Sequence, residues 1–200
     1  MPSSLNKEGE NIIGTPHYLS WIIFAWLTLD DDKHPRVIMY INIRLISLRF
    51  SLRKDILNHC NISFFNHSIM CFILNIYSDD CQNALKYLKN TEVNLNNILI
   101  MTGDFNIRNN DWDPSYPYYL LHTDMLQEVI DSFDLELSMP INLIPTHYIN
   151  SPQESNSILN LMFLRIGSEE FNNHIILPDL QSLSDHTSLS VSITLEKEFI

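Results

Sequence analysis

Residues 97–105 read Asn-Ile-Leu-Ile-Met-Thr-Gly-Asp-Phe, and this stretch decides the fold. Its four consecutive apolar residues end at a Thr-Gly-Asp turn, which is typical of a central strand that stops at a site. Residues 69–77 (IMCFILNIY) form a second run that is nearly continuous in its apolar character. The two runs therefore predict two buried strands.

The flanking sequence adds three strands and two helices. Residues 36–43 (RVIMYINI), 159–164 and 189–195 predict strands because apolar, β-branched or alternating residues dominate them. Apolar residues at helical spacing predict one helix between residues 79 and 90 and another that begins near residue 123. The apolar positions are Ala84, Leu85 and Leu88 in the first helix, and Leu126, Val129, Ile130 and Phe133 in the second. The order predicts a mixed α/β domain in which strands outnumber helices.

The composition predicts a single folded domain. The chain has 200 residues, of which 45% are hydrophobic and 18% are charged, so it can bury a core. It has 12 basic and 24 acidic residues, which gives a formal net charge of −12. A basic face that grips nucleic acid by charge alone therefore cannot dominate the surface. Any contact with nucleic acid must be local or assisted by a cation.

The sequence predicts an intracellular protein with no membrane segment. Cys60, Cys71 and Cys81 match neither a paired disulfide set nor a zinc-binding spacing, so we expect reduced thiols. The longest apolar run, residues 21–29, is far shorter than the roughly 20 residues of a membrane-spanning helix. The N-terminal residues do not have the pattern of a secretion signal.

Asp104 and Asn106 are the first candidate site residues. In an extended chain their side chains point the same way, while Phe105 points into the core. A carboxylate beside a carboxamide suits hydrolysis, because the carboxylate holds or deprotonates a water and the amide donates to a phosphate oxygen. The alternative is a simple turn, because Gly, Asp and Asn all favour turns.

The segment Ser184-Asp185-His186 is the second candidate. Histidine exchanges a proton near neutral pH, and it does so best when a neighbouring group fixes its tautomer. Adjacent Asp and His residues rarely pair with each other, so we expect His186 to find a carboxylate or an amide on another strand. The alternative is a capped loop without catalytic function.

Several segments together resemble the endonuclease/exonuclease/phosphatase superfamily, and in particular the endonuclease domain of non-LTR (LINE-like) retrotransposons in a form common in fungal genomes. The resemblance runs from about residue 34 to residue 193 and implies a two-sheet α/β sandwich (DNase I-like) with helices on the outer faces. The N-terminal composition, which has no periodicity, predicts an irregular segment at residues 1–33, so that one domain spans residues 34–200. The residues that carry the resemblance are 73–77 (ILNIY), 100–106 (IMTGDFN), Pro145-Thr146, 157–163 (SILNLMF) and Ser184-Asp185-His186.

The resemblance implies a role for each matching residue. Tyr77 would hydrogen-bond the scissile phosphate, Asp104 would orient or deprotonate the attacking water, and Asn106 would contact the phosphate. Among the later segments, Thr146 and Ser184 would bind the substrate, Asp185 would be a metal ligand, and His186 would stabilise phosphoryl charge. These roles imply a phosphodiesterase that depends on Mg²⁺ or Mn²⁺ and cuts DNA as an endonuclease. For a retroelement endonuclease, the nucleus is the expected compartment.

Two departures from the family pattern concern catalysis. The opening strands of one sheet, with the glutamate that is the principal magnesium ligand, have no recognisable match, and Glu8 and Glu10 are only weak substitutes. Asn160 stands where the family has the aspartate that steadies the catalytic histidine, and an amide cannot stabilise an imidazolium by charge. The alternative function is therefore a non-catalytic remnant that acts as a binding module. Hydrolysis of a small phosphoester or of a lipid is a third reading.

The segment after Asp104 allows a further, weaker interpretation. Arg108 is a candidate phosphate contact, and the aromatic rings of Tyr116, Tyr118 and Tyr119 are candidates for stacking on unpaired bases. A loop packed over the sheet explains the same residues.

Overall fold

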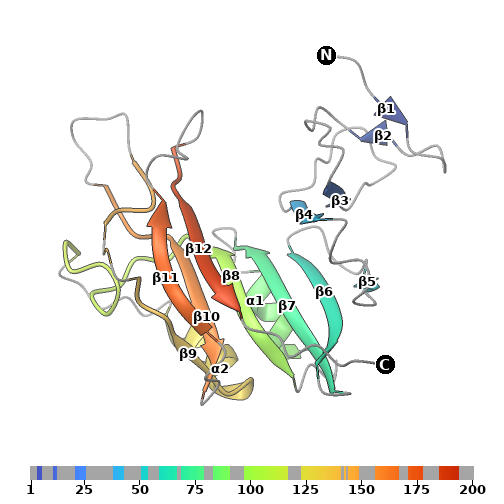
Figure 1. The fold of residues 1–200 in the computed structure, drawn as a ribbon. Helices are drawn as coiled ribbons and strands as arrows, with labels where there is room; N and C mark the ends of the chain where they lie inside the picture. The colour runs from blue at the N-terminus through green and yellow to red at the C-terminus, as the bar shows by residue number, and fades with distance from the viewer. Residues whose placement is uncertain are drawn as a thin grey trace.

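A computed structural model shows the fold (Figure 1). Neither helix in the described part of the chain has the length and apolar character that crossing a membrane requires. The residues that the structure describes are 4–5, 11–12, 21–25, 38–42, 51–53, 59–66, 69–78, 83–90, 97–116, 123–140, 142, 144–148, 156–166, 171–177 and 185–193.

One large sheet forms the centre of the molecule (Figure 1). Strands β7 and β8 are parallel to each other, and the other neighbours in the sheet are antiparallel. In order across the sheet, the strands are β5 (Ser51–Arg53), β6 (His59–Asn66), β7 (Ile69–Tyr77), β8 (Ile98–Asp104), β10 (Asn160–Arg165) and β9 (Leu135–Leu137). The two buried strands that the sequence predicts are therefore the parallel pair β7 and β8.

Two helices cover one face of this sheet. They are α1 (Asn83–Asn90) and α2 (Thr123–Ser132), and both lie behind the central strands in Figure 1. The apolar positions predicted for each helix are buried or packed against the main core. That core also includes Leu74 and Ile76 of β7, Met101 of β8 and Phe163 of β10, where Phe163 meets Phe105 edge-on at 5.3 Å.

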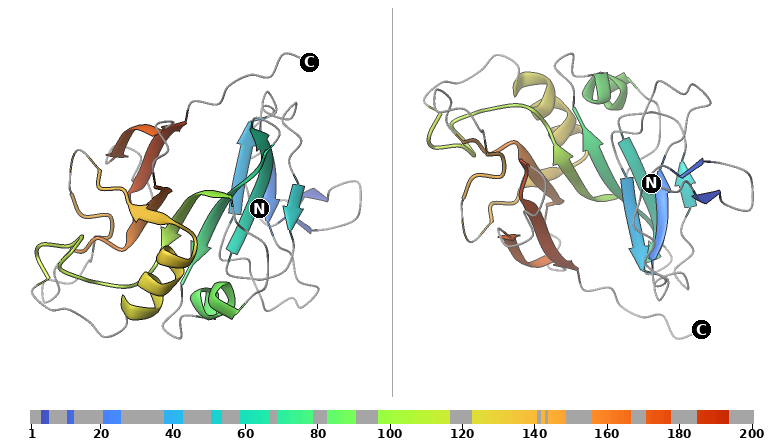
Figure 2. Two further views of the ribbon diagram at one scale, coloured as in Figure 1. Left: turned by 90° about the horizontal axis from the view of Figure 1, so that it is seen from below. Right: turned by 90° about the horizontal axis from the view of Figure 1, so that it is seen from above.

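A two-stranded sheet covers the opposite face. It consists of β11 (Phe171–Leu177) and β12 (Ser188–Ile193), which pair antiparallel. Leu189 and Val191 of β12 pack against a second apolar cluster that includes Ile100 of β8 and Met162 of β10. Figure 2 shows the helices on one side of the large sheet and β11 and β12 on the other. The fold is therefore the predicted α/β sandwich.

Residues 1–33, where the sequence predicts an irregular segment, contain three short strands among the described residues: β1 (Ser4–Leu5), β2 (Asn11–Ile12) and β3 (Trp21–Ala25). Strand β1 pairs with β2, and β3 pairs with β4 (Ile38–Asn42), which lies within the strand predicted at residues 36–43. Strand β3 forms from an apolar run, and its ladder with β4 gives its backbone groups hydrogen-bonding partners. The domain boundary at residue 34 stays a prediction.

Candidate active site

Three of the predicted site residues lie in one row across the large sheet. The register places Tyr77 of β7 opposite Asp104 of β8, and Asp104 opposite Asn160 of β10. Directly opposite residues of neighbouring strands point to the same face of a sheet. Asn160 and Met162 are two residues apart in β10, so their side chains point to the same face of the sheet. Met162 packs against β12, and the row therefore lies on the face that β12 covers.

His186 comes to this row from the second layer, two residues before β12. Its Nδ1 lies 3.0 Å from Asn160 Oδ1, and its Nε2 lies 3.8 Å from Asp104 Oδ2. Asn160 Nδ2 donates to the carbonyl oxygen of Thr187 at 3.1 Å, which leaves Asn160 Oδ1 as the acceptor that faces the ring. The neutral ring therefore carries its proton on Nδ1 and presents an unprotonated Nε2 toward Asp104.

Asp104 has an unusual electrostatic environment. Burial raises the pKa of its carboxyl above the ordinary value of 3.8, because desolvation disfavours the charged form. The nearby His186, the backbone N–H of Asn106 and His147 each oppose this rise. Because the pKa of Asp104 is raised, its carboxylate is a better proton acceptor than an exposed aspartate.

Asn106 holds a tight turn at the end of β8. Its φ of 51° lies in the left-handed region, which asparagine tolerates better than most residues. Its backbone N–H donates to Asp104 Oδ1 at 3.1 Å, and its Nδ2 donates to the carbonyl oxygen of Ser78 at 2.8 Å. The Nδ2 group has a second hydrogen that can be donated to a ligand, and the side chain is exposed.

Gly103 allows β8 to approach β7 closely beside the row. Its φ of 142° is one that residues with a side chain rarely adopt, and a Cβ atom built there overlaps the carbonyl oxygen of Ile76. Glycine is therefore required at this position.

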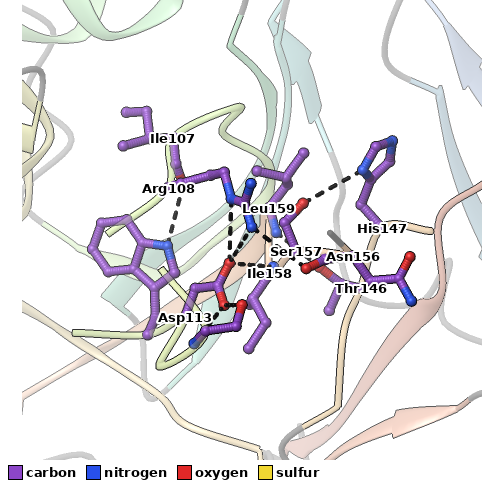
Figure 3. A network of polar contacts seen from close by, with 11 residues as sticks. Ile107, Arg108, Asp113, Thr146, His147, Asn156, Ser157, Ile158 and Leu159 are labelled. Carbon is purple, nitrogen blue, oxygen red and sulfur yellow. Dashed lines mark hydrogen bonds and ion pairs between the residues drawn. The ribbon is translucent and has the colours of Figure 1, made fainter. Parts of the chain in front are cut away.

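Thr146 is completely buried and binds the start of β10 (Figure 3). Its Oγ1 accepts hydrogen bonds from the backbone N–H groups of Leu159, at 2.9 Å, and Asn160, at 3.0 Å. Its own carbonyl oxygen accepts a hydrogen bond from Thr187 N at 2.8 Å. Thr146 therefore ties the segment that bears His186 to the strand that bears Asn160. Its predicted contact with substrate stays a prediction.

His147 is a site residue that the sequence reasoning missed. Its Nε2 lies 3.6 Å from Asp185 Oδ2, and its ring centre lies 4.7 Å from that of His186. Its Nδ1 lies 3.4 Å from Ser157 Oγ (Figure 3). The sequence could have pointed to His147, because this residue directly follows the Pro145-Thr146 motif that carries part of the resemblance.

A polar network supports the site from the side of residues 107–116 (Figure 3). Arg108 Nε and Nη2 each lie 3.4 Å from Asp113 Oδ2, which also accepts from Ile158 N at 3.3 Å. Arg108 also lies over the ring of Tyr116, 4.8 Å from its centre. Arg108 Nη2 also donates to the carbonyl oxygen of Asn156 at 3.4 Å, which joins this loop to the segment that leads into β10, and its contact with a phosphate stays a prediction. Tyr118 and Tyr119 lie outside the described residues.

The structure thus gathers most of the predicted site at one end of the sandwich. Ser184, Glu8 and Glu10 lie outside the described residues, and the roles of all the site residues stay predictions. The residues brought together are Tyr77, Asp104, Asn106, Asn160, Asp185 and His186, with Thr146 beneath them.

Comparison with solved structures supports the fold. The chain is similar to the endonuclease domain of TRAS1, a telomere-specific non-LTR retrotransposon, with a TM-score of 0.68 and 15% sequence identity. The similarity covers 89% of this chain and 82% of that domain. No protein-family model matches the sequence, and no curated protein matches it. The chain therefore has the fold of this endonuclease domain.

Proposed function

We propose that the chain is a phosphodiester hydrolase of the DNA endonuclease type, derived from a retroelement. One observation carries this proposal: Tyr77, Asp104 and Asn160 form a row across three strands, and His186 lies within reach of both Asp104 and Asn160. The TRAS1 domain, which has a similar fold, is an endonuclease domain, and this supports the same reaction class.

The arrangement suits attack by water on a phosphodiester. The Asp104 carboxylate accepts a proton from the water, and its raised pKa favours this transfer. The hydroxyl of Tyr77 and the second Nδ2 hydrogen of Asn106 donate to phosphate oxygens. His186, when protonated, donates from Nε2 to the charge that develops on the phosphoryl group. The bond from phosphorus to the leaving sugar oxygen breaks as the bond to the water oxygen forms, and the leaving oxygen takes up a proton from solvent to become a free hydroxyl.

The metal that the resemblance implies does not fit the described residues well. Mg²⁺ takes oxygen ligands, whereas Asp185 faces two imidazole rings, those of His147 and His186. The mechanism above therefore uses only groups of the chain itself. Mg²⁺ and Mn²⁺ belong in the assay because the resemblance implies them.

Asn160 favours the second candidate function, a non-catalytic remnant that binds a partner. In the family this position is an aspartate, and the amide here contacts the histidine without adding a negative charge. The two candidates differ in one property, which is cleavage.

Nicking of a supercoiled plasmid in Mg²⁺ or Mn²⁺ tests the proposal. The wild-type chain is expected to nick it, and Asp104→Asn is expected to lower the rate by about 100-fold or more because the proton acceptor is lost. The matched control is Asp111→Asn, which removes a carboxylate from an exposed residue of the nearby loop and is expected to nick like wild type.

Thermal unfolding shows whether Asp104→Asn is still folded. Because burial raises the pKa of Asp104, its ionised form lowers stability at neutral pH, and the uncharged amide is not expected to lower the melting temperature. A folded wild-type chain that leaves the plasmid intact would exclude the hydrolase and favour the remnant.

A further inference from the structure

We propose that His147, Asp185 and His186 form a binding site for a divalent transition-metal ion of the Zn²⁺ type. One ligand atom from each residue lies within 4.8 Å of the other two. The two carboxylate oxygens of Asp185 face different rings, with Oδ2 3.6 Å from His147 Nε2 and Oδ1 4.0 Å from His186 Nε2. The Asp185 carboxylate therefore lies between the two Nε2 atoms, and one ligand atom from each residue lies close to the other two.

The contacts on the far side of each ring support this site. A histidine that binds a metal through Nε2 commonly places Nδ1 against a polar partner, which fixes the tautomer. His186 Nδ1 lies 3.0 Å from Asn160 Oδ1, and His147 Nδ1 lies 3.4 Å from Ser157 Oγ. Both rings are thus held by Nδ1 with Nε2 directed at the same carboxylate.

The backbone holds the two histidines side by side without help from a metal. His147 and His186 form an antiparallel bridge, and His147 forms another with Ser157. Tyr148 N donates to the carbonyl oxygen of Asp185 at 2.7 Å, which fixes the third residue. The backbone therefore holds the three ligand residues close together before an ion binds.

The spacing fits a small ion after a modest contraction. Ligand atoms around a tetrahedral zinc ion, with bonds of about 2.0–2.1 Å, lie roughly 3.3 Å apart. The Asp185 side chain is 57% exposed, so it can move toward the rings. Asp104 Oδ2, 3.8 Å from His186 Nε2, is an oxygen that can act as a fourth ligand.

The ligand chemistry selects the class of ion. Imidazole nitrogens suit Zn²⁺, Co²⁺ and related ions, whereas Mg²⁺ keeps oxygen ligands and several waters. A set of two imidazoles and one carboxylate therefore favours a transition metal over Mg²⁺. An ion bound here would also occupy Nε2 of His186, the atom that the proposed hydrolysis uses.

Cobalt absorption tests the site directly. The chelator-treated chain, prepared without a histidine tag, is titrated with Co²⁺ and followed by visible absorption, and thermal unfolding is measured with Zn²⁺ and with Mg²⁺. We expect a saturable 1:1 Co²⁺ spectrum that Zn²⁺ displaces. We also expect Zn²⁺, and not Mg²⁺ at the same concentration, to raise the melting temperature.

Two ligand variants and a control complete the test. His147→Gln and Asp185→Asn are each expected to weaken Co²⁺ binding by about 10–100-fold or more, while Glu136→Gln, on the exposed side of β9, is expected to bind like wild type. The exposed Asp185 side chain makes Asp185→Asn safe for folding, which melting in chelator verifies.

Unchanged Co²⁺ binding in both ligand variants would overturn the site, since the chain has eight histidines and binding would then reside elsewhere. An equal stabilisation by Mg²⁺ would overturn the choice of ion. These experiments measure metal binding and not cleavage, so their result is independent of whether the chain cuts DNA.

Discussion

Asn160 determines how His186 is held. Its Oδ1 accepts from the ring and its Nδ2 donates to the backbone of Thr187, so the amide cannot flip without losing both contacts. The ring is therefore fixed in orientation, while the amide provides no charge to balance a protonated imidazole.

Asn160→Asp is expected to raise the nicking rate about tenfold. A carboxylate 3.0 Å from Nδ1 turns a neutral hydrogen bond into a charge-assisted one, a gain of about 1.4 kcal/mol for the protonated ring, which corresponds to a factor of ten. The carboxylate also loses the hydrogen bond to the carbonyl oxygen of Thr187, which lowers the stability of the fold and leaves this preference for the protonated ring in place. Initial rates of plasmid nicking at matched protein concentration measure the effect. Asn160→Leu, which removes both contacts, should be slower than wild type, and a rate for Asn160→Asp no higher than that of wild type would contradict this view of the residue.

The residues around Asp104 show where sequence reasoning succeeds and where it stops. The prediction that His186 finds an amide or a carboxylate on another strand is confirmed by its contacts with Asn160 and Asp104. The prediction that Asn106 continues the extended strand is wrong, because its φ of 51° makes it a turn residue. Both readings of this segment therefore hold in part: Asp104 ends a strand at the site, and Asn106 forms the turn that caps it.

At the scale of the elements, β7 and β8 were the easiest to predict. Strand β7 has the predicted bounds, and β8 differs by one residue at each end, because continuous apolar runs mark strands that are covered on both faces. Strands β6 and β11 were not predicted, since their sequences mix polar and apolar residues, and neither was the three-residue β9. The row of site residues depends on register between strands far apart in the chain, which no local pattern encodes.

Gly103→Ala is expected to lower the free energy of unfolding by about 3 kcal/mol or more. The added Cβ overlaps the carbonyl oxygen of Ile76, and the φ of 142° is unfavourable for alanine, so β7 and β8 must separate. Urea unfolding measures the change. Ser192→Ala, on the exposed side of β12, is the control and should stay within about 0.5 kcal/mol of wild type.

Thr146→Val is expected to destabilise the chain by about 2–4 kcal/mol. Valine has nearly the same shape but cannot accept the hydrogen bonds from Leu159 N and Asn160 N, which are left without this acceptor at the start of β10. Thr146→Ser keeps the hydroxyl and loses only a methyl group, so it should cost about 1 kcal/mol. Chemical denaturation of the three proteins separates the two effects, and equal losses in both variants would show that packing, not the hydroxyl, matters.

At the scale of the whole molecule, the site exists only where two layers meet. The large sheet provides Tyr77, Asp104 and Asn160, and the segment before β12 provides His186. The apolar contacts that pack β12 on the large sheet therefore also position His186 beside that sheet. The residue patterns alone predicted a mixed α/β domain, whereas the resemblance predicted the two layers and that their residues meet.

Leu189→Ala is expected to lower stability by about 2 kcal/mol and to lower the nicking rate as well. The leucine packs β12 onto the second apolar cluster, and its loss loosens the segment that holds His186. Denaturant unfolding and plasmid nicking measure the two effects. Ser188→Ala, an exposed neighbour, should change neither, and a nicking rate that survives a loosened β12 would show that the bridge to His147 and the contact with Asn160 hold His186 without β12.

The two layers of the site come from different parts of the chain, so the site residues are synthesised in a fixed order during translation. The ribosome makes β7 and β8 early, then β10, and His186 last of these groups. A half-made chain already carries the carboxylate of Asp104 but has no imidazole to place beside it. The site is therefore incomplete until residue 186 has been synthesised and its segment has docked on the large sheet.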